Sequence, residues 1–503
     1  MSRTRQFAVN TGTGYALIVA NIAFTVLSIP LALRYLGKEE FGLWALAQQI
    51  AGYLMLIDFG LSSAVSRLLA NHKDHINGGP YGSLLITGAA VFILQGMMVF
   101  ALGALFALFA PALFQVPPAL ADTFRNIITL LAALTGVTIA LRSLTAPLWA
   151  FQRLDVSYGL GIISLVVGLA SLWAAFYLGW GIYSFAIAGI PPLIVGTVVG
   201  FAVCQRAGFY PSRGNWGQPR WETFREMFAF GKDVMLLSVG SQLVNSSQIM
   251  ILGRTAGLEA AATFAVGTKF YTLGSQLTGR LVESSAPALT EMFVQKDNNR
   301  LRHRFVDVFR TSLFLGTVGS IALVAANTLV VRWWTSGVVE WNGRWDFLLG
   351  ALLLATTSSR CLVGLFGIAG NLRPVRNLYW VEGAVFIAIG IPTATRFGIP
   401  GLIGASLLVH LLVTLTFSSV AARRVLGENT SFNHLMLQAG LIVCVIFFVT
   451  QAFPQFSSSL GYGLLTGLVM VAGTISAWFL IMSPGARIQL VKRARSSICR
   501  MHT

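Results

Sequence analysis

Charged residues are scarce in this chain: they make up 11% of its 503 residues, whereas 55% are hydrophobic. Soluble domains carry about 25% charged residues, so this deficit excludes an ordinary water-soluble protein. Apolar runs of about twenty residues recur along the whole chain, and each is long enough to cross a hydrocarbon core of about 30 Å as a helix. The sequence therefore predicts an all-α integral membrane protein.

Cysteine and acidic residues are also rare. The four cysteines have no paired spacing, which excludes a disulfide framework and a zinc motif. There are 18 Asp and Glu against 35 Lys and Arg, which gives a net charge of +17. This excess does not indicate nucleic-acid binding, because the basic residues lie in short loops between apolar runs, where they orient a membrane protein.

The hydropathy pattern predicts about fourteen transmembrane helices. Their approximate limits are 11–33, 41–69, 81–109, 124–146, 156–178, 182–204, 229–252, 260–292, 306–330, 346–370, 377–395, 399–420, 434–453 and 461–482. The second and eighth segments are longer than a bilayer requires, so we expect tilt, or a break near Gly60 in the second.

The loops show which side of the membrane each end occupies. With the N-terminus inside, about 23 of the 35 cations fall in inside loops and about seven in outside loops. This asymmetry predicts an even number of spans and cytoplasmic termini. One outside loop gathers Trp333, Trp334, Trp341 and Trp345, as expected of aromatic side chains at the membrane interface.

The longest inside loop divides the chain. We predict an N-terminal lobe of six spans at 1–204, a cytoplasmic linker at 205–228, a C-terminal lobe of six spans at 229–420, and two C-terminal helices with a basic cytoplasmic tail at 421–503. Within the linker, Trp221, Phe224 and Phe228 recur at helical spacing opposite Arg220 and Arg225. This pattern predicts a helix lying on the membrane surface, and a solvated linker is the alternative.

The two halves resemble each other. Each places an acidic outside turn before a long span rich in small and polar residues, with Glu39 and Glu40 in the first half and Glu259 in the second. Two six-helix lobes of like topology around a central cavity are typical of a transporter whose site lies between them.

Several cations lie inside apolar segments, where a charge costs a few kcal/mol or more unless it faces a cavity or a partner. Lys269 and Arg280 are eleven residues apart, which places them on nearly the same helix face, about 16 Å apart in depth. Glu283 follows Arg280 by three positions, so those two side chains pair directly, either as a structural ion pair or as part of a lumen. Arg360 lies near the middle of the tenth span without a local carboxylate. We predict that these cations line a lumen for an anion.

Other charges in spans have two interpretations each. Arg67 and Arg142 lie near the inside ends of the second and fourth spans, where snorkelling explains them as well as a lumen does. The carboxylates of Asp58, Glu283 and Glu382 are candidates for coupling transport to a proton or sodium gradient. Asp58 is alternatively a cap beside the chain break, and Glu382 alternatively lies at the interface.

Histidine and the loops add little further chemistry. His410 lies within a span, where it relays protons or forms a hydrogen bond between helices. No constellation of catalytic residues or metal ligands stands out, and no cofactor is expected. The largest outside loop, RWWTSGVVEWNGRWD, is too short to house a glycosyl-transfer site. We therefore predict that the protein is not an enzyme.

The second span carries the residues of a known pattern. In YLGKEEFGLWALAQQIAGYLMLIDFGLSSAVSR, the matching positions are Leu36-Gly37, Phe41-Gly42, Trp44, Tyr53, Asp58 and Gly60-Leu61. On these residues the chain resembles the Wzx-like O-antigen and polysaccharide flippases of the multidrug/oligosaccharidyl-lipid/polysaccharide superfamily. The block MILGRTAGLEAAATFAVGTKF is similar to the start of that family's second lobe. Related sequences often carry an acidic residue near the position of Gln248, which this chain lacks.

The resemblance implies a function. The substrate would be a lipopolysaccharide-type oligosaccharide on undecaprenyl diphosphate, flipped across the bacterial inner membrane to its periplasmic face by alternating access. The expected partners are this lipid-linked glycan, membrane lipids, and polysaccharide polymerase and chain-length proteins. A lipid II flippase or a multidrug exporter of the same fold are the alternatives. A membrane polymerase or ligase is disfavoured by the short outside loops.

Overall fold

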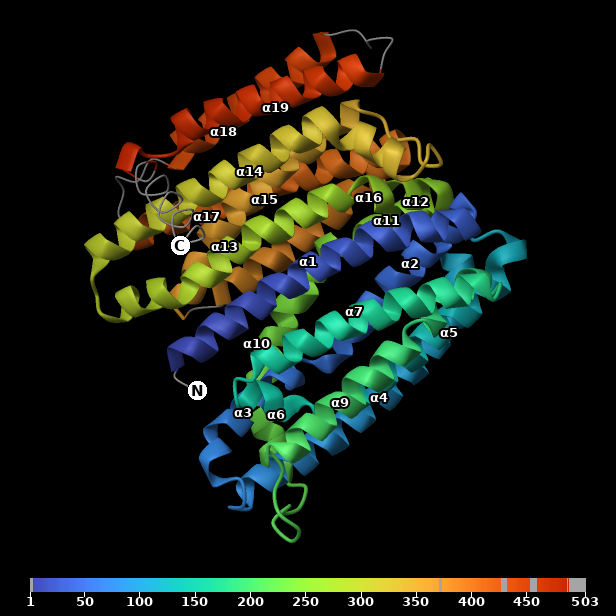
Figure 1. The fold of residues 1–503 in the computed structure, drawn as a ribbon, viewed down its shortest axis with the longest axis vertical. Helices are drawn as coiled ribbons and strands as arrows, with labels where there is room; N and C mark the ends of the chain where they lie inside the picture. The colour runs from blue at the N-terminus through green and yellow to red at the C-terminus, as the bar shows by residue number, and fades with distance from the viewer. Residues whose placement is uncertain (1–2, 371–372, 427–431, 453–458, 486, 488–503) are drawn as a thin grey trace, which may run out of the picture. The chain divides into compact units, whose positions relative to one another are not determined.

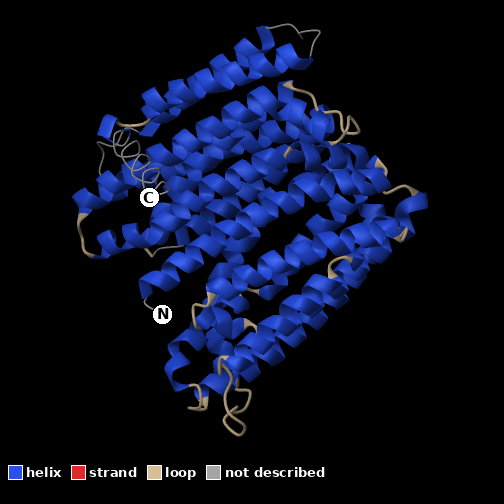
Figure 2. Ribbon diagram, in the orientation of Figure 1, coloured by secondary structure: helices blue, strands red, loops and turns tan. Residues whose placement is uncertain are grey.

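The structure is a computed structural model that describes residues 3–370, 373–426, 432–452, 459–485 and 487. Figure 2 shows helices joined by short loops, and no strand occurs among the described residues. The all-α fold expected from the hydropathy pattern is therefore confirmed. Most of the predicted basic tail, residues 488–503, lies outside the described part of the chain. The contacts between helices divide the chain into two compact units, Met1–Thr263 and Phe264–Thr503.

Long helices form the first unit (Figure 1). They are α1 (Arg3–Tyr35), α2 (Lys38–Leu54), α3 (Leu61–Asn71), α4 (Pro80–Leu113), α5 (Pro118–Ala140), α7 (Leu154–Tyr177), α9 (Ile190–Arg206) and α10 (Trp221–Asn245). Shorter elements join them: η1 (Met55–Asp58), η2 (Lys73–His75), η3 (Leu141–Leu144), α6 (Ala146–Ala150), η4 (Gly181–Tyr183), α8 (Ser184–Ile187) and α11 (Ser247–Thr255). The next helix, α12 (Leu258–Gly267), contains the boundary between the units.

The expected break in the second span is present. Phe59 and Gly60 both have left-handed backbone angles, with φ of 51° and 69°, and the chain bends by 40° between η1 and α3. A Cβ atom at Gly60 would lie 2.6 Å from the carbonyl oxygen of Gly231 on α10, and one at Gly231 would lie 2.6 Å from that of Phe59. Glycine at both positions therefore lets two backbones touch at the break.

A second pair of glycines holds the longest antiparallel contact of this unit, between α4 and α5. A Cβ atom at Gly96 would overlap the carbonyl oxygen of Gly136, and a Cβ atom at Gly136 would lie 2.5 Å from the carbonyl oxygen of Gly96. Small residues at a crossing let helix backbones approach closely, which is how van der Waals packing joins helices in a membrane.

The second unit consists of long helices packed around one of them, α15. Its elements are α13 (Lys269–Val294), α14 (Asn298–Trp334), α15 (Arg344–Ile368), α16 (Arg373–Val409), the π-helix η5 (His410–Leu415), α17 (Thr416–Leu426), α18 (Phe432–Ala452) and α19 (Ser459–Ile481). The apolar segment of α15 is 78% buried, and α13, α14, α16 and α18 all pack against this helix. Gly398, with φ of 62° and ψ of −135°, divides α16 into two helical halves.

The helix inventory is consistent with about fourteen spans. In the described residues, ten helices are long and apolar enough to cross a membrane, and α2 with α3 makes an eleventh as a bent pair. Two predicted spans merge in the segment Arg373–Arg423, which the kink at Gly398 separates. Helices α12 and α19 contribute the shorter apolar segments Leu258–Gly267 and Thr466–Ile481.

The last part of the predicted linker at 205–228 belongs to a long helix, α10. Helix α10 begins at Trp221 and continues to Asn245, so it contains both the aromatic segment expected on the membrane surface and most of the seventh predicted span. Trp221, Phe224 and Phe228 stack along its first turns, and Trp221 and Phe228 are exposed. The proposed domain limits at residues 204, 229 and 420 stay predictions.

Candidate functional site

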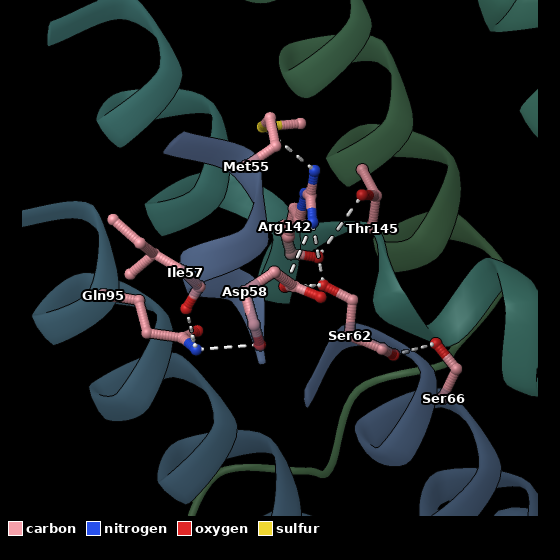
Figure 3. Close-up of polar contacts among 8 residues, drawn as sticks. All are labelled: Met55, Ile57, Asp58, Ser62, Ser66, Gln95, Arg142 and Thr145. Atoms are coloured by element: carbon pink, nitrogen blue, oxygen red, sulfur yellow. Dashed lines mark hydrogen bonds and ion pairs between the residues drawn. The ribbon is translucent and has the colours of Figure 1, made fainter. Parts of the chain in front are cut away.

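Two predicted site residues meet at the break in the first unit (Figure 3). The guanidinium of Arg142 donates from Nη1 to Asp58 Oδ1 at 3.1 Å and to Ser62 Oγ at 3.0 Å. Ser62 in turn donates to Asp58 Oδ1 at 2.5 Å. The side chains of Asp58 and Arg142 are 16% and 30% exposed. The two charges therefore compensate each other in a mostly buried place.

Local backbone geometry builds this contact. Asp58 ends η1, where the left-handed Phe59 turns the chain, and Arg142 lies in η3, which ends α5. The buried amide of Gln95 on α4 donates to the carbonyl oxygens of Ile57 and Asp58, both at 2.9 Å. These two bonds satisfy carbonyls that the helix break leaves unpaired. The Asp58 carboxylate contacts the side chains of Arg142 and Ser62, whereas Gln95 meets its backbone carbonyl. Both interpretations given for Asp58, a cap beside the break and a coupling carboxylate, stay predictions.

Arg67 lies elsewhere in the first unit. Its guanidinium carbon is 4.5 Å from the ring centre of Phe230 on α10. This is a cation–π contact, worth about 0.5–1 kcal/mol for a partly exposed side chain. The contact links α3 to α10, and the role of Arg67 in a lumen stays a prediction.

In the second unit, helix α13 carries an exposed polar stripe made of Thr272, Gln276, Arg280 and Glu283. Their spacing of three or four positions places them on one helix face. The adjoining face packs against α15 through Ser275, Thr278 and Gly279. Helix α13 packs along α14 and α15, both of which are apolar enough to span a membrane. Such a stripe is costly against lipid and is stable against water.

Two cations belong to this face or its edge. Arg280 pairs with Glu283 at 3.0 Å, and the two side chains are 55% and 66% exposed, so solvent weakens the pair and leaves both groups accessible. Arg360 reaches across from α15 and donates to the carbonyl oxygen of Ser275 at 3.0 Å. Its side chain is exposed, and a Cβ atom at Gly279 would lie 3.1 Å from its Nη1. The absence of a side chain at Gly279 therefore leaves room for this guanidinium.

Lys269 differs from the other cations. It is the first residue of α13 and is half-buried. Among the described residues it has no hydrogen-bond or ion-pair partner. Helical spacing places it on the face of the polar stripe, one turn before Thr272.

A buried acid–base pair lies deeper in the second unit. Glu382 Oε1 on α16 is 3.2 Å from Nδ1 of His410, the first residue of η5. Glu382 is buried rather than exposed at an interface. Two tyrosines, Tyr271 and Tyr379, interact electrostatically with both Arg360 and Glu382.

The sequence reasoning missed one polar centre, around Asp346 in the first turn of α15. This carboxylate is 1% exposed and accepts hydrogen bonds from the side chain of Asn327 at 2.7 Å, the hydroxyl of Thr328 at 2.5 Å and the indole of Trp341 at 2.6 Å. A Cβ atom at Gly267 would overlap the same indole. The available signal was an acidic residue directly after the tryptophan-rich loop, at the start of an apolar helix.

The described residues contain no group of three or more His, Cys, Asp or Glu side chains able to hold a metal ion. The described residues do form an ion pair between Asp58 and Arg142 in the first unit. In the second unit, Arg280 and Arg360 lie on or beside an accessible polar face. The roles predicted for the individual charged residues stay predictions.

Comparison with known proteins places the chain in a family. A family model described as polysaccharide biosynthesis protein matches residues 11–293, more than half of the chain. The chain belongs to this polysaccharide biosynthesis protein family. This agrees with the flippase resemblance carried by the second span. Among curated proteins, the uncharacterized membrane protein EpsK of Bacillus subtilis (strain 168) is 22% identical over 303 residues, which are 58% of this chain and 58% of EpsK.

Solved structures share the fold of this family member. The lipid II flippase MurJ, in an inward closed conformation, aligns with a TM-score of 0.70 and 13% identity over 92% of this chain and 98% of MurJ. An inward-facing multidrug resistance MATE transporter of the MOP superfamily aligns with a TM-score of 0.65 and 12% identity over 81% of this chain and 96% of the transporter. The chain is thus a multi-pass membrane protein with the fold of flippases and transporters.

Proposed function

We propose that this protein flips an oligosaccharide linked to undecaprenyl diphosphate from the cytoplasmic to the periplasmic face of the bacterial inner membrane. Membership of the polysaccharide biosynthesis family and the fold shared with a lipid-linked precursor flippase support a lipid-linked glycan as the substrate class. Both termini are cytoplasmic in this proposal, as the loop charges indicate.

The accessible polar stripe of α13, flanked by Arg360, is the observation that carries the proposal. A stripe of hydroxyl, amide and guanidinium groups at membrane depth requires water or a polar ligand beside it. Guanidinium groups bind phosphate oxygens through strong, charge-assisted hydrogen bonds, and amides bind sugar hydroxyls. Arg280 and Arg360 together would hold the diphosphate, and Gln276 would contact the glycan. Lys269, at the end of the same face, would meet the anion at another depth.

The membrane potential supports outward movement of such a substrate. The cell interior is negative, so moving about two negative charges outward through 100 mV releases roughly 4–5 kcal/mol. If the bound cations neutralise the diphosphate, the same energy appears when the empty cationic site returns inward. Proton exchange through a carboxylate is the other source of energy. Flipping by the reconstituted protein that ignores both the potential and the pH gradient would exclude this coupling.

Removing the cations one at a time tests the proposed function. Lys269→Ala, Arg280→Ala and Arg360→Ala should each lower surface glycan while the protein stays in the membrane. Loss of a charged hydrogen bond to the diphosphate is worth about 1.5–3 kcal/mol, which corresponds to about a tenfold or larger loss of flipping at limiting substrate. Arg125→Ala is the matched control, because Arg125 pairs with Asp122 at the exposed start of α5. Full export by all three variants would show that the assignment is wrong.

A flipping assay with the reconstituted protein distinguishes the proposed function from its alternatives. Proteoliposomes loaded with lipid II, with an undecaprenyl-diphosphate oligosaccharide, or with a cationic dye present each candidate substrate in turn. The excess of cations on the exposed face disfavours a cationic drug, so we expect no dye transport. Equal flipping of lipid II and of the longer oligosaccharide would assign the specificity to the lipid diphosphate alone.

A further inference from the structure

Glu382 is a buried carboxylate with one hydrogen-bond or ion-pair partner. Its side chain is 4% exposed, and His410 is its single hydrogen-bond or ion-pair partner among the described residues. By contrast, the other buried carboxylate of this unit, Asp346, accepts hydrogen bonds from three neighbouring residues. A buried carboxylate with one hydrogen-bond partner is stable only when that partner is a cation or when the carboxylate itself carries a proton.

The histidine geometry shows where a proton can be exchanged. Nδ1 of His410 lies 3.2 Å from Glu382 Oε1 and also 3.2 Å from the carbonyl oxygen of Ser406. A carbonyl oxygen only accepts, so Nδ1 carries a hydrogen and donates it to these two acceptors. The exchangeable proton is therefore on Nε2 of the imidazole or on the carboxylate. Gaining this proton changes the charge of the buried pair from −1 to 0.

Charged and titratable groups near the Glu382–His410 pair respond to this change of charge. The charged and titratable groups within electrostatic range of the pair, among the described residues that neighbour it, include Tyr271 of α13 and Tyr379 of α16, and both tyrosines also lie within range of Arg360 on α15. Arg360 is the one fixed cation among these three groups. In a medium of low dielectric constant, a difference of one elementary charge changes the electrostatic interaction with nearby groups much more than it would in water.

The pair also joins two segments that irregular backbone geometry separates. Glu382 lies in the first half of α16, before the kink at Gly398, and His410 opens the π-helix that follows the second half. Single-turn π segments inside helices often occur at functional sites. One turn further along, Thr414 is 3% exposed, and its hydroxyl has no hydrogen-bond partner in the described part of the chain. Buried hydroxyls usually have a hydrogen-bond partner, so this turn of η5 leaves a polar group unsatisfied.

We propose that Glu382 and His410 form a proton-binding site whose occupancy sets the packing of η5 against the first half of α16. Protonated, the pair is neutral and holds the two segments together through the ion pair. Deprotonated, the pair carries a net negative charge that the single guanidinium of Arg360 must compensate. The link to transport rests on the function proposed above, in which this pair would be the coupling site.

Nitrogen NMR of the histidine rings tests the site without any glycan. The full-length protein, labelled with ¹⁵N-histidine in lipid nanodiscs, is titrated from about pH 5 to about pH 9, the range that brackets an imidazole. Loss of its signal in His410→Gln assigns His410, and His434→Gln on the exposed part of α18 is the matched control. We expect the ring of His410 to gain one proton within this range, and Glu382→Gln to displace that transition, because a contacting carboxylate stabilises an imidazolium.

Amide hydrogen exchange of residues 399–426 supplies the second measurement. We expect exchange in this segment, corrected for intrinsic rates, to depend on pH in the wild-type protein and not in Glu382→Gln. An imidazole that keeps one protonation state throughout, or a transition that Glu382→Gln leaves in place, would overturn the proposal. Because neither measurement uses substrate, failure of the proton site and failure of the flippase assignment are seen in separate experiments.

Discussion

Asp58 and Arg142 are 84 positions apart in the chain and form an ion pair of 3.1 Å beside the break between η1 and α3. One is a predicted coupling carboxylate and the other a predicted lumen cation. Their contact means that neither acts alone in this state. An anion that binds Arg142 therefore competes with Asp58 for the same guanidinium.

Breaking this pair should destabilise the first unit. Asp58→Asn or Arg142→Gln leaves one charge unpaired in a mostly buried contact, which costs about 1–3 kcal/mol, between the values typical of exposed and buried pairs. The double variant should recover part of the loss. Thermal unfolding in detergent measures these effects, with Arg125→Gln in the exposed Asp122–Arg125 pair as the control. Strictly additive losses in the double variant would show that the two side chains do not interact.

The polar stripe of α13 should be accessible to water. In a cysteine-free background, Gln276→Cys and Thr272→Cys should react with a membrane-impermeant maleimide, because a stripe that faces a cavity is reached by water. Leu441→Cys on α18 is the matched control: Leu441 is 60% exposed but belongs to an apolar face suited to lipid. Equal protection of all three positions would contradict a water-filled cavity beside α13.

The centre around Asp346 should be structural rather than part of the transport path. Asp346→Asn replaces an acceptor with an amide that meets four donor groups from three residues, which should cost about 2–4 kcal/mol. Trp341→Phe removes one donor and keeps most of the ring, so its effect should be smaller. Glu340→Gln, in the exposed loop beside it, should leave thermal stability unchanged. Normal stability of Asp346→Asn would argue that this carboxylate is already protonated.

The crossing of α4 and α5 should tolerate no side chain. Gly96→Ala places a methyl group on the carbonyl of Gly136, and the forced separation of the helices should cost about 1–3 kcal/mol. Gly159→Ala on α7 is the control, because a Cβ atom there meets no atom within 4 Å. Retained protein and melting temperature in Gly96→Ala would mean that the crossing readjusts freely.

Hydropathy and local spacing were enough to predict the helical class, the approximate spans, the break near Gly60 and the Arg280–Glu283 contact. These features depend on residues close together in the chain. The pairs Asp58–Arg142 and Glu382–His410 depend on how separate helices cross, which periodicity does not report. Each member of these pairs was a candidate from its chemistry alone, whereas its partner could not be inferred.

Asp346 was missed for a different reason. An acidic residue in the first turn of a helix ordinarily lies in water, where it interacts favourably with the helix dipole. Here the tryptophan-rich loop folds over it, and the indole of Trp341 becomes its donor. The clustering of tryptophans in this loop predicts an interfacial belt, and nothing in that pattern indicates that Trp341 bonds a buried carboxylate.

The paired glycines at the helix break have a consequence for how the chain can vary. Gly60 and Gly231 touch through their backbones, so a side chain at either position pushes on the other segment. A methyl group at Gly231 would displace Phe59 and, with it, the turn that presents Asp58. Random mutagenesis should therefore find these two distant positions intolerant together, and suppressors of a change at one should map to the segment that carries the other.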